Sequence, residues 1–275
     1  MKERIDIQLV ERGLAPTRER AQAYLMAGVV RVCGRQELKA GTKFDTSVEI
    51  EVISDPIKFV SRGGLKLEGA LDEWDIDLDG AVCVDIGAST GGFTDLMLSR
   101  GAEKVYAIDV GYGQLDYKLR QDSRVVNMER TNVRYLDPES IPEKADFVSI
   151  DVSFISLKHI FPVAAGLLNN CHCGLDPTCA GTHRQVSRSE SMDSGSAAGM
   201  TRVVGASIVA LVKPQFEALR EQVGKGGIIR DTKIHDEVLE KVKGYAGVSN
   251  LDVLAVMPSP ITGTKGNKEF LMWLR

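Results

Sequence analysis

The sequence predicts an α/β protein in which a Rossmann-like, mostly parallel sheet carries helices on both faces and follows a small α+β domain. Three observations predict this fold. An apolar strand runs into a glycine turn near residue 87, strand-like and helical segments alternate from Phe59 onward, and residues 1–55 have helix and strand signals of their own. Such alternation builds parallel sheets, and 275 residues are enough to bury two cores.

Residues 1–55 predict a domain of two helices followed by short strands. Apolar side chains recur at helical spacing around Leu9 and again from Ala21 to Leu25. Thr17 is placed to cap the second helix, and Gly28 ends it. Short strands are expected over residues 29–33, 34–35 and 48–53.

A linker over residues 56–62 leads into the larger domain, which we expect to occupy residues 63–275. Its first helix is predicted from Leu65 to Trp74. Strands are expected near residues 81–86, 104–109, 125–128, 145–152, 206–212, 251–257 and 269–274, with helices between them. A short turn separates the last two strands, which predicts a hairpin that gives the sheet an antiparallel edge. That hairpin is typical of methyltransferases that use S-adenosylmethionine.

Charge and hydropathy exclude several classes of protein. The formal net charge of -4 gives no overall signature of polyanion binding, so a nucleic-acid surface has to be a local patch. No apolar run approaches the roughly 20 residues that span a bilayer, and the charged N-terminus is unlike a signal peptide. We therefore expect a cytoplasmic protein. Cys33 and Cys83, in apolar strand-like contexts, are expected to be reduced core thiols.

Residues 169–204 depart from the alternating pattern. They are polar, rich in serine and poor in large aliphatic side chains, which predicts a mobile insertion. The segment contains possible zinc ligands, namely Cys171, His172, Cys173, Cys179 and His183. Because their spacing is not that of paired C-x2-C knuckles, no metal site is expected.

The glycine turn predicts a nucleoside-binding half-site. Gly87, Gly91 and Gly92 allow the backbone to approach a ligand, and Asp109 ends the next strand where it can hold two ribose hydroxyls. Asp85 stands just before the turn, where a carboxylate suits an ammonium group and repels phosphate. S-adenosylmethionine has an amino-acid end, a ribose and no phosphate, so it fits better than NAD. The alternative is a turn that only serves strand-to-helix packing.

Four ionisable residues are expected at the carboxyl edge of the sheet, where open α/β sheets bind their ligands. They are Lys66, Asp151, Lys213 and Glu269. Asp151 and Lys213 follow strongly apolar runs, so pairing them lowers the cost of burying each charge. The alternative is a strand-end salt bridge without a chemical role.

The N-terminal segment also resembles a known module. The ordered run of Arg4-Ile-Asp6, Leu9, Gly13, Arg18 and Gly28-Val29-Val30 is similar to an S4 domain, which presents basic residues to structured RNA. The resemblance implies RNA binding. The arginines expected to contact RNA are Arg4, Arg18, Arg20 and Arg31 in this segment and Arg62 after it. A merely solvated basic face is the alternative.

Motifs across almost the whole chain resemble the TlyA family, also called hemolysin A, whose catalytic domain is similar to FtsJ-type ribose 2'-O-methyltransferases. The matching segments include Ser61-Arg-Gly-Gly-Leu-Lys66, Asp85-Ile-Gly-Ala-Ser-Thr-Gly-Gly-Phe-Thr94, Asp151-Val-Ser-Phe154, Leu211-Val-Lys-Pro-Gln-Phe-Glu217 and Gly266-Asn-Lys-Glu-Phe270. The resemblance carries a Lys-Asp-Lys-Glu tetrad onto Lys66, Asp151, Lys213 and Glu269, with Lys213 as our candidate base. The insertion is a departure from the family.

For the cofactor, the resemblance and the glycine turn together imply S-adenosylmethionine. Asp109 is expected to bind its ribose, and Asn132 to lie near its adenine. The residues expected to frame its methionine end are Asp85, Gly87, Ala88, Gly91, Gly92 and Phe93.

The expected function is therefore ribose 2'-O-methylation of ribosomal RNA, with cytidines of 16S and 23S rRNA implied by the resemblance. The expected partners are ribosomal RNA or ribosomal subunits, with no membrane. A membrane-active hemolysin is one alternative, although no spanning or strongly amphipathic cationic segment supports it. A non-catalytic RNA-binding or ribosome-assembly factor is another. A small-molecule methyltransferase would leave the S4-like segment without a purpose.

Overall fold

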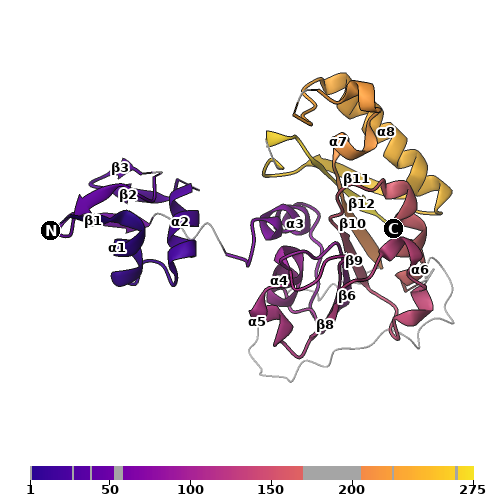
Figure 1. Cartoon of the computed structure of the whole chain (residues 1–275). Helices are drawn as coiled ribbons and strands as arrows, with labels where there is room; N and C mark the ends of the chain where they lie inside the picture. The colour runs from indigo at the N-terminus through magenta and orange to yellow at the C-terminus, as the bar shows by residue number, and fades with distance from the viewer. Residues whose placement is uncertain are drawn as a thin grey trace, which may run out of the picture. The chain divides into compact units, whose positions relative to one another are not determined.

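The computed structural model describes residues 2–26, 28–37, 39–52, 58–169, 206–224, 226–263 and 266–275. The chain divides into two compact units, Met1–Arg62 and Gly63–Arg275, and each is described by itself (Figure 1). All but the first residue of the expected insertion, with its possible zinc ligands, lies outside the described residues. Within the described ranges, no helix is long and apolar enough to cross a membrane. Those same ranges hold no cluster of three or more potential metal ligands.

The N-terminal unit packs two helices against short strands. Its elements are β1 (Lys2–Arg4), α1 (Ile5–Glu11), α2 (Arg18–Met26), β2 (Val30–Val32), β3 (Arg35–Gln36), β4 (Lys43–Asp45) and β5 (Ile50–Val52). Ile5, Leu9 and Leu25 are fully buried in its core. Thr17 Oγ1 accepts a hydrogen bond from the Arg20 N–H at 3.3 Å, which confirms the expected cap. Gly28 follows α2 with a φ of 74°.

The expectation that Cys33 is a core thiol is wrong. Strand β2 ends at Val32, and Cys33 and Gly34 form the two-residue loop of a hairpin, with Val32 paired to Arg35. Both loop residues have a positive φ, 49° and 76°, as a tight hairpin turn of this type requires. The turn therefore carries Cys33 out of the strand and exposes it, whereas Cys83 is buried.

The larger unit is built on one seven-stranded sheet in the order β11-β12-β10-β9-β6-β7-β8. Its strands are β6 (Val82–Ile86), β7 (Lys104–Ile108), β8 (Val125–Met128), β9 (Phe147–Ile150), β10 (Ser207–Val212), β11 (Val253–Pro258) and β12 (Phe270–Leu274). Every residue of β9 and β10 is buried, which explains why both segments are apolar except for Ser149 and Ser207. The expected strands are thus confirmed, with ends that shift by one or two residues.

The expected hairpin is confirmed, and its second strand enters the sheet. Strand β12 pairs antiparallel with β10 on one side and with β11 on the other. Strand β11 therefore forms the edge and runs parallel to the remaining strands. The last strand thus begins, at Phe270, beside the residue that ends β10, Val212. This arrangement brings the start of β12 to the carboxyl edge of the sheet.

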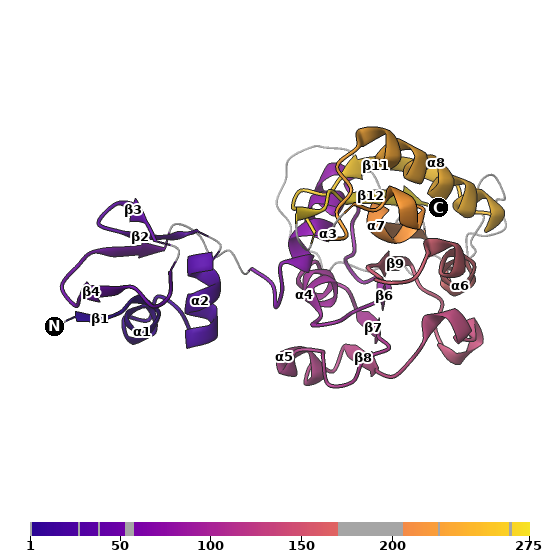
Figure 2. The ribbon, with the colours of Figure 1, turned by 45° about the horizontal axis from the view of Figure 1, so that its top comes forward.

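Helices cover both faces of this sheet. Helices α3 and α4 lie on one face, and α6 and α8 lie on the other (Figures 1 and 2). The helices are α3 (Gly63–Glu73), α4 (Gly92–Ser99), α5 (Tyr117–Arg120), α6 (Phe161–Leu167), α7 (Pro214–Glu217) and α8 (Thr232–Val248). The layered α/β architecture expected from the sequence is therefore present.

Candidate functional site

The turn between β6 and α4 has a backbone that suits glycine at two positions. Gly87 and Gly91 have φ values of 87° and 94°. A Cβ on Gly87 would overlap the Asp151 carbonyl oxygen, and one on Gly91 would overlap the Leu119 side chain. The turn therefore packs closely against the Asp151 backbone and the Leu119 side chain. Between the two glycines, Ser89 also has a positive φ, 49°, which is uncommon for a residue with a side chain.

Asp109 follows β7 and is joined to this turn. Its Oδ2 accepts the Ser89 N–H at 2.8 Å, and its Oδ1 accepts the Gly111 N–H at 2.7 Å. Each carboxylate oxygen has a second lone pair, so both can still accept from a hydroxyl. Asn132 is exposed after β8, and its Oδ1 accepts the Arg134 N–H at 3.1 Å. The Thr131 N–H donates to the Asp109 carbonyl at 2.9 Å, so the expected ribose and adenine residues are neighbours.

Two residues expected to frame the methionine end are buried behind the turn. Asp85 is fully buried, and its two oxygens accept hydrogen bonds from Thr94 Oγ1 at 2.7 Å and Ser149 Oγ at 2.9 Å. Phe93 is only 3% exposed and packs in the core. Neither side chain faces solvent in this structure, so both support the turn from the interior of the domain. This placement differs from the expectation that the Asp85 carboxylate faces an ammonium group.

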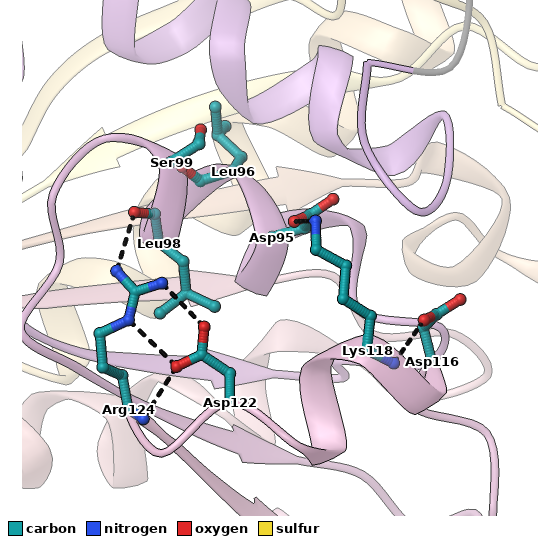
Figure 3. A network of polar contacts seen from close by, with 8 residues as sticks. All are labelled: Asp95, Leu96, Leu98, Ser99, Asp116, Lys118, Asp122 and Arg124. Carbon is teal, nitrogen blue, oxygen red and sulfur yellow. Dashed lines mark hydrogen bonds and ion pairs between the residues drawn. The ribbon is translucent and has the colours of Figure 1, made fainter.

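Polar contacts hold the helices that flank the turn (Figure 3). Lys118 Nζ in α5 lies 3.4 Å from Asp95 Oδ1 in the first turn of α4. Asp116 caps α5 by accepting the Lys118 N–H at 2.9 Å. Further along, Arg124 Nη1 donates to the Leu98 carbonyl at 3.4 Å, which joins the end of α4 to the start of β8. These contacts connect α4, which begins at the glycine turn, to α5 and to the start of β8.

The four ionisable residues form two ion pairs at the carboxyl edge. Lys66 Nζ in α3 donates to Glu269 Oε2 at 2.6 Å, and these side chains are 12% and 3% exposed. Lys213 Nζ lies 2.6 Å from Asp151 Oδ1 and donates to Ser153 Oγ at 2.9 Å. The approach of Lys213 to Asp151 is a close charge pair without an aligned hydrogen bond. The expected pairing of Asp151 with Lys213 is present.

A cavity of about 310 Å³ joins one member of each pair, because both Lys213 and Glu269 line it. The lining also includes Phe154, whose ring lies 4.8 Å from the ring of Phe216, centroid to centroid. Phe154 is 89% exposed and has a φ of 64°. The cavity lies where β9 and β10 end and β12 begins, on the side of the sheet away from β7.

Glu217 joins the segment that follows β9 to the segment that follows β10, a role that nothing in the sequence indicated. The residue is 4% exposed at the end of α7. Its carboxylate accepts from Ser156 Oγ and from the Leu157 N–H, each at 2.7 Å. Burial raises the pKa of the Glu217 carboxyl, and these hydrogen bonds oppose that rise. The segment after Asp151 is thereby tied to the segment after Lys213.

Gly263 and Asn267 were also missed, and they shape the loop before Glu269. A Cβ on Gly263 would overlap Glu269 Oε1. Asn267 is buried, its Nδ2 donates to the Gly227 carbonyl at 2.9 Å, and its Oδ1 accepts the Ile229 N–H at 3.2 Å. A glycine and an asparagine in a Gly/Lys/Asn-rich turn look like ordinary turn residues, so only the long-range contacts distinguish them.

In the N-terminal unit, two of the expected RNA-binding arginines share one buried partner. Asp6 is fully buried and accepts from Arg4 Nε at 3.0 Å and Arg18 Nε at 2.9 Å. Hydrogen bonds from Arg4 hold the pKa of the Asp6 carboxyl well below its usual range. The Arg4 and Arg18 side chains remain 38% and 50% exposed. The other expected arginines are half-buried at Arg20 and exposed at Arg31 and Arg62.

Known proteins are similar to this chain over its whole length. A family model described as FtsJ-like methyltransferase matches residues 59–275. The 16S/23S rRNA (cytidine-2'-O)-methyltransferase TlyA of Mycobacterium tuberculosis is 40% identical, over 99% of this chain and 89% of its own length. YqxC of Bacillus subtilis, provisionally named an rRNA methyltransferase, is 45% identical over 99% of this chain and 85% of its own.

A solved structure is similar as well. It is that of a Streptococcus thermophilus protein provisionally named a hemolysin, with 43% sequence identity and a TM-score of 0.69. The similarity covers 99% of this chain and 88% of that one. Both units of the present chain therefore lie within the similarity.

Proposed function

Because the chain belongs to the FtsJ-like methyltransferase family, we propose that it transfers a methyl group from S-adenosylmethionine to a ribose 2'-hydroxyl of ribosomal RNA. The protein is an S-adenosylmethionine-dependent methyltransferase. When bound, S-adenosylmethionine supplies a methyl group on a sulfonium, already activated for transfer. The residues of the chain then have to align the 2'-hydroxyl with that methyl group and accept the proton of the hydroxyl.

The residues around the glycine turn fit this cofactor. Gly87 and Gly91 leave the turn without a side chain at two positions, Ala88 lies between them, and Gly92 is the first residue of α4. Asp109 has one lone pair on each oxygen available for the two ribose hydroxyls. Asn132, next to it, would lie beside the adenine.

The proposed chemistry rests on a single observation: two lysine–carboxylate pairs meet at one cavity. Lys213 is the proposed base. Once its ammonium group has released a proton to solvent, the neutral Nζ would take the proton of the 2'-hydroxyl. Asp151 holds that nitrogen at 2.6 Å, and Ser153 fixes its direction. Lys66 is bonded at 2.6 Å to Glu269, which lines the cavity, and this pair would orient the hydroxyl. Positioning of this kind supplies much of the rate enhancement in a group transfer.

The RNA substrate is inferred from the relatives and supported by the N-terminal unit. The M. tuberculosis relative is named for cytidines of 16S and 23S rRNA, so we propose cytidines of ribosomal RNA, free or in assembled subunits. We propose that the N-terminal unit acts as an S4-like RNA-binding domain and that Arg4, Arg18, Arg20, Arg31 and Arg62 contact phosphates. A ribosomal RNA substrate would be met in the cytoplasm.

Replacing the proposed base tests the reaction. With labelled S-adenosylmethionine and ribosomal subunits that lack the modification, Lys213→Ala should lower methyl transfer by about 10² or more. Affinity for S-adenosylmethionine, measured by calorimetry, should not change. Lys243→Ala is the matched control, because it removes a lysine that pairs with Glu240 on the surface of α8. That variant should keep wild-type activity.

The product and the pairwise variants complete this test. A 2'-O-methyl group blocks attack on the neighbouring phosphate, so the modified position should resist alkaline cleavage. Lys66→Ala and Asp151→Ala should also lower methyl transfer. When either is combined with Lys213→Ala, the double variant should lose less activity than the sum of the two single losses, expressed as free energies. A methyl group on a base, or a fully active Lys213→Ala enzyme, would refute the mechanism. Cofactor binding without any transfer would instead indicate a non-catalytic RNA-binding factor.

A further inference from the structure

Two arginines of the N-terminal unit share one buried carboxylate, that of Asp6 in the first turn of α1. Asp6 Oδ1 accepts a hydrogen bond from Arg4 Nε, and Oδ2 accepts one from Arg4 Nη2, each at 3.0 Å. Oδ2 also accepts from Arg18 Nε at 2.9 Å and from Gln22 Nε2 at 3.1 Å. We call these four residues the Asp6 cluster. Strand β1 and helices α1 and α2 therefore meet at a single carboxylate.

The charges of the Asp6 cluster do not balance. One arginine is enough to neutralise a buried carboxylate, so the second leaves a net positive charge on the cluster. Asp6 is fully buried, whereas the side chains of Arg4 and Arg18 both reach the surface. The surplus positive charge is therefore held where an external anion can neutralise it. Arginine pairs readily with phosphate, the anion that RNA presents.

Asp6 also sets the direction in which Arg18 presents its donors. A guanidinium carries five N–H donors in one rigid plane. Within the described part of the chain, Arg18 meets Asp6 through its Nε, which leaves the two Nη groups available to a ligand. Because the plane is rigid, the bond at Nε fixes the orientation of both Nη groups. A side chain that is oriented before binding loses less freedom on binding, which strengthens the complex.

We propose that Asp6 is a positioning residue for RNA binding, which holds Arg4 and Arg18 so that their free N–H groups contact phosphates of the RNA backbone. This inference rests on the proposed function and adds a residue that does not itself touch the RNA. The negative charge of Asp6 alone would weaken binding to a polyanion. Its effect on the geometry of the two arginines strengthens binding. The two effects have opposite signs, so an experiment can separate them.

Asp6→Asn separates charge from positioning. The variant keeps the size of the side chain and removes a negative charge, so charge alone predicts tighter RNA binding. Loss of positioning predicts the opposite, because the asparagine NH2 group faces arginine donors and cannot hold both. The affinity of the full chain for ribosomal subunits that lack the modification should fall about 10-fold. Co-sedimentation at one fixed salt concentration measures it, and circular dichroism checks that the variant is folded.

Double variants distinguish positioning from a general loss of structure. In the wild-type background, Arg18→Ala should lower affinity for the subunits about 10-fold. In the Asp6→Asn background the same change should cost less than about threefold, because Arg18 is already displaced. Arg31 is the matched control, since it is exposed on β2 and lies outside the Asp6 cluster. Arg31→Ala should cost the same factor in both backgrounds, whereas a general loss of structure would diminish the effect of both arginines.

A second pair of variants leaves Asp6 in place. Arg18→Lys keeps the positive charge, but its single nitrogen cannot bond to Asp6 and also offer two parallel donors to a phosphate. Its affinity for the subunits should fall about fivefold or more, whereas Arg31→Lys should stay within about twofold of the wild type. This contrast tests the role of Asp6 even if Asp6→Asn does not fold.

The outcomes distinguish this inference from the proposed function. Three results would each overturn the role of Asp6 and leave methyl transfer and RNA binding intact. They are unchanged or tighter binding by folded Asp6→Asn, an equal cost of Arg18→Ala in both backgrounds, and equal affinities of Arg18→Lys and Arg31→Lys. If removal of residues 1–62 left binding to the subunits unchanged, the RNA-binding role proposed for the N-terminal unit would fail, and this inference with it.

Discussion

At the scale of single residues, the proposed site depends on the close approach of the Gly263 backbone to the Glu269 carboxylate. A Cβ at this position would overlap Glu269 Oε1, and Gly263 is itself buried. Gly263→Ala should therefore push the carboxylate away from Lys66 and lower methyl transfer by about 10-fold or more, because small misplacements in an active site are costly. Affinity for S-adenosylmethionine should stay the same. Both quantities can be measured on the purified variant.

Gly244 in α8 provides the matched control for this substitution. A Cβ there would meet nothing within 4 Å. Because alanine is the better helix former, Gly244→Ala should raise the free energy of unfolding by roughly 0.5–1 kcal/mol and leave methyl transfer unchanged. Equal activity in both alanine variants would show that Glu269 does not need its present position.

The buried Asp85 gives the protein a specific pH dependence. Burial raises the pKa of its carboxyl to about 6, although hydrogen bonds from Thr94 and Ser149 oppose the rise. In the unfolded chain the pKa of an aspartate is about 3.9, so between about pH 4 and pH 6 the folded state binds more protons. Stability should therefore fall as the pH rises through this window, by on the order of 2–3 kcal/mol in total.

Asp85→Asn should remove this contribution. The free energy of unfolding of the variant, relative to the wild type, should increase between pH 4 and pH 7, because only the wild type has to bury a charge at the higher pH. Urea unfolding at a series of pH values measures that difference. A difference that is the same at every pH would show that the Asp85 carboxyl titrates alike in the folded and unfolded chain.

At the scale of elements, helix α7 depends on one side chain. It has only four residues, Pro214–Glu217, too few for a helix to be stable alone. The carboxylate of Glu217 accepts from Ser156 and Leu157 across two strand-end segments. Glu217→Ala should lower the free energy of unfolding by about 1–3 kcal/mol, because it leaves the buried Leu157 N–H without its partner. Methyl transfer should fall too, since the proposed base, Lys213, directly precedes α7.

Glu217→Gln, compared with Glu217→Ala, tests whether the hydrogen bonds or the negative charge of Glu217 matter. Its amide can accept the Leu157 N–H and donate to Ser156 Oγ, so it should recover most of the stability and activity lost in Glu217→Ala. Urea unfolding and labelled-methyl transfer on both variants check this pair. If the glutamine enzyme were as impaired as the alanine enzyme, the negative charge rather than the two hydrogen bonds would be what matters.

Elements of the sheet could be predicted because each has a local cause. The apolar run that becomes β10 is buried on both faces, and the turn after β6 has glycines where φ is positive. Strands β1 and β4 escaped prediction, since each has three residues and pairs with a partner about 40 positions away. Cys33 was misplaced because the type of a two-residue turn decides where a strand ends.

The site was predictable to a similar degree. Lys66, Asp151, Lys213 and Glu269 could be found because strand ends and family motifs mark them. The roles of Glu217 and Asn267 could not be predicted, because their hydrogen-bond partners are 60–61 and 38–40 residues away in sequence, respectively. Asp6 was hidden in the same way, since an acidic residue among arginines resembles a surface charge until its burial is known.

At the scale of the whole molecule, each unit has a hydrophobic core of its own. Ile5, Leu9 and Leu25 are in one core, whereas Ile150 and Leu211 are buried with the sheet of the other unit. The glycine turn, both ion pairs and the cavity are formed by residues of Gly63–Arg275. Binding of S-adenosylmethionine and binding of RNA should therefore be separable.

Removing residues 1–62 tests that separation. The remaining fragment should fold, with a cooperative urea transition, and bind S-adenosylmethionine with an affinity within about twofold of the full chain. The reason is that the residues around the glycine turn all belong to Gly63–Arg275, and independent sites contribute additively, to within about twofold in affinity. It should lose methyl transfer to ribosomal RNA. In the full chain, Arg31→Glu should weaken RNA binding and reduce its salt dependence, since each phosphate contact releases counterions. Equal RNA affinity with and without the N-terminal unit would mean that the larger unit holds the RNA by itself.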